Sequence, residues 1–101
     1  MSLDSKETTS GLDQIVLSKF DKIIREVNDS LEKSVKITFE SKLQEELGLD
    51  SLDLCHFLYE VEKEFNISIN EGRIKGFSKV GDYYSHIKQE YPDCLKNLKL
   101  Y

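Results

Sequence analysis

The clearest pattern in the chain is a helical repeat of apolar side chains near its start. Between Leu12 and Leu31 apolar residues recur three or four positions apart, and charged residues occupy the opposite face. This spacing predicts an amphipathic helix of about five turns with one face towards a core. Ser10, followed three residues later by Asp13, provides a capping signal for its start. The apolar positions are Leu12, Ile15, Val16, Phe20, Ile23, Ile24, Val27 and Leu31.

A second helix is predicted from Ser51 to Phe65, with apolar residues on two faces. The inward stripe consists of Leu54, Phe57, Leu58, Val61 and Phe65. A second stripe at the same spacing consists of Leu52, Cys55, Tyr59 and Glu62. A domain this small has little material with which to bury both faces. We therefore expect the second stripe to be an exposed contact surface.

The stretch between these helices, residues 28–50, has no sustained period and predicts a long loop. A connection of this length is uncommon in a compact domain and usually has a function or ordering contacts of its own. Thr38 or Ser41 is expected to cap a single turn over Leu43–Leu47. The side chains expected to anchor the loop are Ile37, Phe39, Leu43 and Leu47.

The last third of the chain predicts a short helical turn and a final helix. Asn70 is placed to cap a turn near Glu71–Lys75. The final helix is expected to begin near Ser78 or Lys79 and to end at Pro92, because proline cannot continue the hydrogen-bond ladder. We expect residues 1–10 to be a flexible leader, 11–91 a single domain and 92–101 a tail that is partly helical and docked.

Composition and length narrow the class of protein. The chain has 101 residues, of which 33% are charged and 39% hydrophobic, as in a globular domain too small for a large enclosed active site. No apolar run has membrane-spanning length and no signal-peptide pattern opens the chain. Two cysteines make no disulfide framework, and no Cys/His cluster has zinc spacing. We expect a cytoplasmic monomer with no membrane partner.

The charge distribution excludes one class of partner. The net charge is −5, which argues against nucleic acid, because binding there depends on Lys and Arg contacts to phosphates. Residues 1–65 hold 15 acidic and 8 basic side chains, whereas residues 66–101 hold 4 and 6. An acidic front half suggests partners with basic docking surfaces, although a solvated acidic face would give the same pattern.

The most informative motif is the run of residues 47–54, Leu-Gly-Leu-Asp-Ser-Leu-Asp-Leu. Gly48 lacks a Cβ and permits a sharp entry from the loop. Asp50 or Ser51 then supplies a capping oxygen, with Asp53 three residues after Asp50. A group on Ser51 would lie at the positive end of a helix dipole, where an anion such as a phosphodiester is favoured. An unmodified N-cap would have the same sequence.

Together with its surroundings this motif resembles the acyl carrier proteins over roughly Leu12 to Glu90. The resemblance rests on the order and spacing of several short runs. These are Ile37-Thr38, Leu43-x-x-Glu46-Leu47-Gly48-Leu49-Asp50-Ser51-Leu52-Asp53, Glu60-x-Glu62-x-Glu64-Phe65-x-Ile67-x-Ile69 and Phe77-x-x-Val80. The resemblance implies an all-α four-helix bundle of acyl carrier type, with a long first loop and a short third helix.

The resemblance implies a carrier and not an enzyme. In this family a phosphopantetheinyl transferase moves 4′-phosphopantetheine from coenzyme A to the serine that corresponds to Ser51. Asp50, Leu52 and Asp53 would border that site, with Asp50 and Asp53 near magnesium during the modification, although the free protein would hold no metal. Carboxylate oxygens suit magnesium. The arm would carry acyl chains as thioesters for fatty acid or specialised lipid or polyketide synthesis.

The resemblance also implies a partner surface on the second and third helices. The partners would be the transferase and acyl-transferring, ketosynthase-type or acyl-activating enzymes. Ile69 and Ile74 would lie near the arm or an acyl pocket. The residues of the expected partner surface are Leu52, Cys55, His56, Tyr59, Glu62, Lys63 and Ile74.

The chain departs from the family pattern in its charges. His56 and Lys63 interrupt the acidic run of the second helix, and Arg73 and Lys75 replace carboxylates in the third. This favours a dedicated carrier in a specialised lipid pathway over the main fatty acid pathway.

Two other functions are compatible with the residues. One is an unmodified helical adaptor that binds a partner through the second helix and tolerates Ser51→Ala. The other is a small enzyme dependent on Cys55, although no base stands at catalytic spacing.

Overall fold

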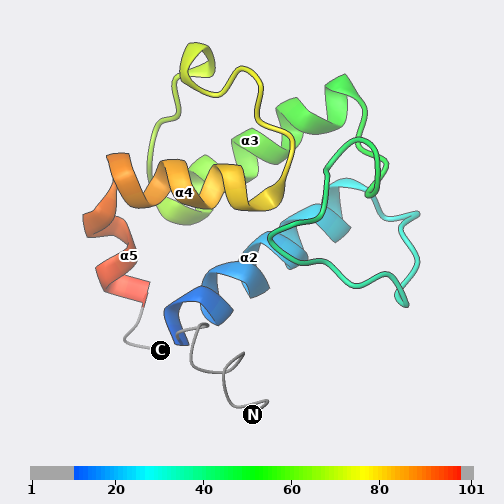
Figure 1. Cartoon of the computed structure of the whole chain (residues 1–101), viewed down its shortest axis with the longest axis horizontal. Helices are drawn as coiled ribbons and strands as arrows, with labels where there is room; N and C mark the ends of the chain where they lie inside the picture. The colour runs from blue at the N-terminus through cyan, green and yellow to red at the C-terminus, as the bar shows by residue number, and fades with distance from the viewer. Residues whose placement is uncertain (1–10, 99–101) are drawn as a thin grey trace.

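The computed structural model describes residues 11–98, and its regular elements are helices (Figure 1). This confirms the predicted all-α bundle, whereas the capping signal at Ser10 lies outside the described residues. Within residues 11–98 no helix has both the length and the apolar character needed to cross a membrane. The elements are α2 (Gly11–Val27), α3 (Ser51–Phe65), the 3₁₀ turn η1 (Glu71–Arg73), α4 (Val80–Glu90) and α5 (Pro92–Leu98).

Helix α2 ends one turn earlier than its apolar repeat predicts. The last helical residue is Val27, and the chain turns at Asn28, whose carbonyl accepts a hydrogen bond from the Leu31 amide at 3.1 Å. The Asn28 side chain also accepts from the Ser30 amide, a local bond that competes with the helical ladder. Leu31 still packs, half-buried, against the core. The prediction that Leu31 belongs to the helix was therefore wrong, although its side chain does pack against the core.

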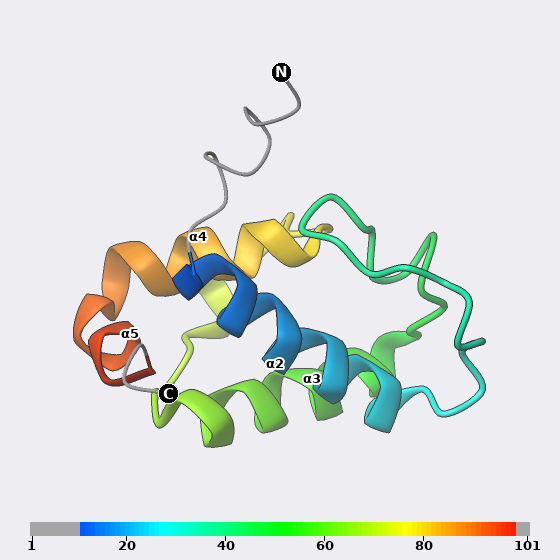
Figure 2. The same cartoon turned by 90° about the horizontal axis from the view of Figure 1, so that it is seen from below.

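The core is centred on aromatic side chains from three helices. Phe20 of α2 lies 5.9 Å from Phe57 and 5.7 Å from Phe65 of α3, measured between ring centroids. Phe57 in turn meets the edge of Tyr83 from α4 at 5.2 Å. Such aromatic pairs add to the free energy of burial. Figure 2 shows α2 lying along α3, the arrangement that this cluster holds.

The long loop, residues 28–50, is ordered by backbone hydrogen bonds to the start of α4. The Leu43 amide donates to Ser78, and the amides of Val80 and Gly81 donate to Ser41 and Phe39, at 2.8–3.0 Å. The expected anchors Ile37, Leu43 and Leu47 are buried, and Phe39 stacks on Tyr84 with 5.0 Å between ring centroids. Such contacts explain how a connection of this length stays in a compact domain.

The expected cap of a turn at residues 43–47 is absent. The Ser41 hydroxyl instead accepts a hydrogen bond from the Thr38 amide at 2.9 Å, so both residues close a turn within residues 38–41. Residues 43–47 form hydrogen-bonded turns in which the Leu47 amide donates to the Lys42 carbonyl. The predicted turn at residues 43–47 is therefore present, but the prediction of its cap was wrong, because the Thr38 and Ser41 side chains accept hydrogen bonds from backbone amides of residues 38–41.

The third helix of the predicted bundle is the 3₁₀ turn η1, only three residues long. Asn70 caps it as predicted, accepting a hydrogen bond from the Gly72 amide at 2.8 Å. Helix α4 follows with Lys79 as its N-cap residue, and the Asp82 carboxylate accepts from the Ser78 and Lys79 amides. Burial alone would raise the pKa of Asp82, but these backbone donors hold it below its usual value.

The described part of the chain ends in a short helix that packs on the bundle. Helix α4 stops at Glu90, and Pro92 occupies the first position of α5, where its missing N–H costs nothing. Leu95 of α5 is buried in the core. Helix α5 itself lies against α4 and the start of α2 (Figure 1). The hydroxyl of Tyr84 donates to Asp13 at 2.6 Å and ties α4 to the start of α2.

Removing the central aromatic ring should destabilise the fold strongly. We expect Phe20→Ala to lower the free energy of unfolding by about 3–5 kcal/mol, because it leaves a cavity between α2 and α3. Tyr59→Ala, at an exposed position of α3, is the control and should change it by less than about 0.5 kcal/mol. Urea unfolding followed by circular dichroism measures both. Equal losses for the two variants would contradict the assignment of Phe20 to the core.

Candidate functional site

The start of α3 is held by a reciprocal pair of hydrogen bonds. The Asp53 amide donates to the Asp50 carboxylate at 2.9 Å, and the Asp50 amide donates to the Asp53 carboxylate at 3.2 Å. This capping box satisfies two backbone groups at a helix end that would otherwise lack partners. Of the two caps that the sequence left open, the structure selects Asp50. Ser51 is therefore the first residue of the helix.

The approach to α3 is fixed by a polar residue that sequence reasoning missed. The Asn28 side chain donates to the Leu47 carbonyl at 2.9 Å. Gly48 follows with φ +74°, a conformation open to glycine, and a Cβ there would lie 3.3 Å from the Asn28 side-chain nitrogen. Leu49 is buried and its amide bonds to Leu43. Gly48 indicates a sharp turn at this point, but nothing in the sequence indicates that Asn28 bonds to residue 47.

Ser51 presents an exposed hydroxyl at this helix end. Its side chain makes no hydrogen bond to any other residue of the described part of the chain. The N-terminus of a helix carries partial positive charge, so an anionic group on this oxygen would be stabilised there. An exposed, unengaged hydroxyl at such a point fits the attachment of a phosphodiester-linked group.

The outer face of α3 is apolar at two exposed positions. Leu52 is 80% exposed and Tyr59 is 58% exposed. His56 and Lys63 both lie close to the Glu60 carboxylate, at 3.3 Å and 3.6 Å, and the Lys63 ammonium also lies 5.1 Å from the Tyr59 ring centroid. Cys55 is exposed on the same helix. We call Leu52, Cys55, His56, Tyr59 and Lys63 the outer face of α3.

Two residues of the expected partner surface are less available than the others. Glu62 is half-buried, and its carboxylate accepts a hydrogen bond from the Ile69 amide at 2.7 Å. Ile74 follows η1 and packs, half-buried, against the core. Ile69, expected near an arm or acyl pocket, is a core residue with 7% of its surface exposed. These three side chains serve the fold of the segment after α3.

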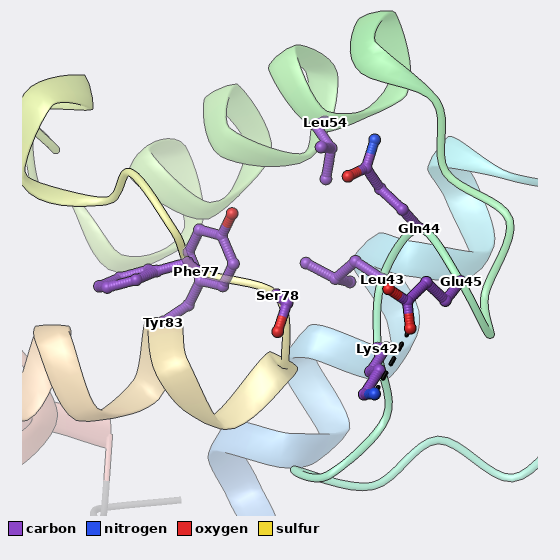
Figure 3. Close-up of a pocket in the computed structure, with 8 residues that line it drawn as sticks. All are labelled: Lys42, Leu43, Gln44, Glu45, Leu54, Phe77, Ser78 and Tyr83. Carbon is purple, nitrogen blue, oxygen red and sulfur yellow. Dashed lines mark ion pairs between the residues drawn. The ribbon is translucent and has the colours of Figure 1, made fainter.

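A small cavity lies between α3, the long loop and the start of α4 (Figure 3). Its volume is about 30 Å³. Leu54, one turn after Ser51, contributes to the lining, and the Tyr83 hydroxyl points towards α3 (Figure 3). The sequence does not indicate this position of Tyr83, because periodicity does not distinguish a filled core from the wall of a cavity. The lining residues are Lys42, Leu43, Gln44, Glu45, Leu54, Phe77, Ser78 and Tyr83.

A small helical bundle with a long first loop, leading into a capped helix whose first residue is an exposed serine, has the architecture of a phosphopantetheine-attachment domain. The family model described as "Phosphopantetheine attachment site" matches residues 21–87, about two thirds of the chain. That range contains α3 with Ser51, η1 and most of α4.

Curated relatives give the same result. The chain is 38% identical to the acyl carrier protein of Phytoplasma australiense over 63 residues, which are 62% of this chain and 83% of that protein. It is 32% identical to that of Rickettsia bellii over 79 residues, 73% of this chain and 92% of that one. A solved structure assigned to the acyl carrier proteins, from Mycobacterium tuberculosis, superposes with TM-score 0.59 at 27% identity, covering 81% of this chain and all of that one.

The chain belongs to the acyl carrier protein family. Members of this family are carriers and not enzymes, and their cofactor is a covalent 4′-phosphopantetheine group. Among the residues that the structure describes, no group of three or more His, Cys, Asp or Glu side chains could hold a metal ion.

Loss of the cap should loosen the start of α3 without unfolding the domain. We expect Asp50→Ala to lower the free energy of unfolding by about 1 kcal/mol, because the Asp53 amide loses its acceptor. Asp50→Asn keeps an acceptor oxygen and should retain most of that stability. Chemical denaturation gives the free energies, and amide hydrogen exchange at Asp53 reports the local effect. Unchanged exchange at Asp53 in Asp50→Ala would refute the capping role.

Proposed function

We propose that Ser51 is the attachment point of 4′-phosphopantetheine. The observation that carries this proposal is the exposed Ser51 hydroxyl, free of hydrogen bonds to the described residues, at the first position of α3. In the modification its oxygen would form a bond to the pantetheine-bearing phosphorus of coenzyme A, the pyrophosphate bond would break, and 3′,5′-ADP would leave. The hydroxyl proton would pass to a base of the transferase.

Asp50 and Asp53 would assist that reaction from either side of Ser51. Each carboxylate accepts one backbone hydrogen bond in the capping box, and both side chains remain at the surface or half-exposed. A carboxylate oxygen has further lone pairs, and oxygen ligands suit magnesium. The pair would thus help to hold magnesium at the coenzyme A phosphates while the transferase is bound.

Once attached, the group supplies a terminal thiol that holds an acyl chain as a thioester. A flexible tether raises the effective concentration of that chain at each partner's active site. The rigid part of the carrier is the start of α3, where Asn28, Gly48 and the capping box fix the position of Ser51. The protein thus positions the base of the arm and leaves the chemistry to its partners.

We also propose that this carrier serves a dedicated lipid or polyketide pathway. The three carboxylates in the second half of α3 are all engaged within the chain: Glu60 with His56 and Lys63, Glu62 with the Ile69 amide, and Glu64 with Lys19 at 2.6 Å. They offer a basic partner less attraction than unpaired carboxylates would. The basic Arg73 of η1 is paired with Glu90.

Partner enzymes would then dock mainly through apolar contact on the outer face of α3. Leu52 stands directly beside Ser51, and Tyr59 lies two turns further along the helix. Exposed aromatic and aliphatic side chains of this kind are typical anchors of protein interfaces. The partners would be the phosphopantetheinyl transferase and acyl-transferring, ketosynthase-type or acyl-activating enzymes. An unmodified adaptor would use the same face, so the modification of Ser51 distinguishes the two functions.

Intact mass spectrometry tests the attachment directly. After incubation with coenzyme A, magnesium and a promiscuous phosphopantetheinyl transferase, the wild-type chain should gain one phosphopantetheine. Ser51→Ala should gain none, because it lacks the accepting oxygen. Ser34→Ala, which removes an exposed serine of the long loop, is the matched control and should be modified like the wild type. A folded wild-type chain that gains no mass would exclude the carrier function and favour the adaptor.

Partner docking can be tested by shortening one exposed side chain. We expect Leu52→Ala to lower kcat/KM of the transferase about tenfold, mainly through KM, because an interface anchor is lost. Its free energy of unfolding should stay within about 0.5 kcal/mol of the wild type, since Leu52 is 80% exposed. Lys33→Ala, exposed on the long loop, serves as control. Unchanged kinetics in Leu52→Ala would remove Leu52 from the docking surface.

A further inference from the structure

The cavity behind the start of α3 is close to the proposed attachment point. Leu54 lines the cavity and lies three residues after Ser51, about 4.5 Å along the helix axis. A volume of about 30 Å³ holds one or two water molecules. One side is bordered by the exposed Lys42–Glu45 ion pair, at 3.4 Å. Exposed pairs of this kind contribute little to stability, so these side chains can move aside to admit a short chain.

The ring of Tyr83 is held rigidly at the wall of this cavity. It meets Phe57 edge-on at 5.2 Å between centroids and 82° between planes. It meets Phe77 at 5.1 Å and 87°. Two edge-to-face contacts and burial leave the ring little freedom. Its hydroxyl therefore keeps the direction seen in Figure 3, towards α3.

The Tyr83 hydroxyl has no hydrogen-bond partner within the described residues. No fully buried side-chain oxygen or nitrogen of those residues lacks a partner, so this hydroxyl must be reached by solvent. Burial and the nearby Asp82 raise the pKa of Tyr83, and the hydroxyl keeps its proton near neutral pH. It can both donate and accept a hydrogen bond. The neighbouring Tyr84 differs, because its hydroxyl is bonded to Asp13.

The chemistry of the cavity distinguishes between acyl chains. A saturated chain would displace water from the Tyr83 hydroxyl and leave it without a partner, which is unfavourable. The hydroxyl or oxo group of a substituted chain would instead form the hydrogen bond to Tyr83 that the displaced water had made. We propose that Tyr83 is a specificity-determining residue that makes this carrier shelter short hydroxy- or oxo-substituted acyl chains in preference to saturated chains of the same length. This inference rests on the proposed attachment at Ser51.

The test compares two four-carbon cargoes on one carrier. Butyryl- and 3-hydroxybutyryl-phosphopantetheine are loaded from the corresponding coenzyme A thioesters by a promiscuous transferase. Cleavage by hydroxylamine is followed by intact mass spectrometry, and each rate is divided by that of the same thioester on free pantetheine. On the wild type we expect the hydroxylated cargo to be protected about tenfold more than butyryl.

Two tyrosine variants assign the difference to one hydroxyl. Tyr83→Phe keeps the ring and its edge contacts, and should abolish the difference between the cargoes. Tyr84→Phe removes the neighbouring hydroxyl, which does not line the cavity, and should retain it. Thermal unfolding confirms that both variants are folded. Equal protection of the two cargoes on the wild type, or a difference that persists in Tyr83→Phe, overturns this inference while leaving the carrier function intact. Failure to load any cargo on a folded wild type would overturn both.

Discussion

The position of Ser51, the proposed attachment point, depends on the two hydrogen bonds exchanged between Asp50 and Asp53. They determine at which residue the loop ends and the helix begins, and hence that Ser51 is the first helical residue. A slip of the sequence by one residue along the helix would rotate every side chain of α3 by about 100° around the helix axis. The buried and exposed faces of α3 would then no longer match the core. With this start, Phe57 is buried, Leu52 is exposed and Ser51 lies at the surface.

Helix α3 has a buried structural face and an exposed apolar face, which we propose is the recognition face. Its inner face joins the aromatic cluster with Phe20, and its later carboxylates bind other parts of the same chain. The outer face keeps apolar side chains exposed at Leu52 and Tyr59, where burial would be favourable only with another molecule. This arrangement would suit a carrier whose partners exchange on one side while the other side keeps the fold. It also agrees with the proposal that the partners are recognised by apolar contact more than by charge.

Local patterns predicted the helices well, whereas long-range contacts had to be observed. The bounds of α3 and the Asn70 cap follow from spacing and side-chain chemistry within a few residues. The end of α2 was misjudged because Leu31 keeps an apolar role after the helix has stopped. Nothing local indicates that Asn28 holds Leu47, or that Tyr83 borders a cavity, since both depend on segments distant in sequence. The Asp-Ser-Leu-Asp run was informative because its chemistry is local.

The pairing of the long loop with the start of α4 has a consequence for the order of folding. Phe39, Ser41 and Leu43 receive their backbone partners from residues about forty positions later in the chain. Contacts of such sequence separation require closure of a large loop and slow the folding of an otherwise helical domain. During synthesis the segment that leads into Ser51 therefore lacks these partners until residues 78–81 have left the ribosome. In a nascent chain that ends before residue 78, the loop that leads into Ser51 would be incompletely ordered.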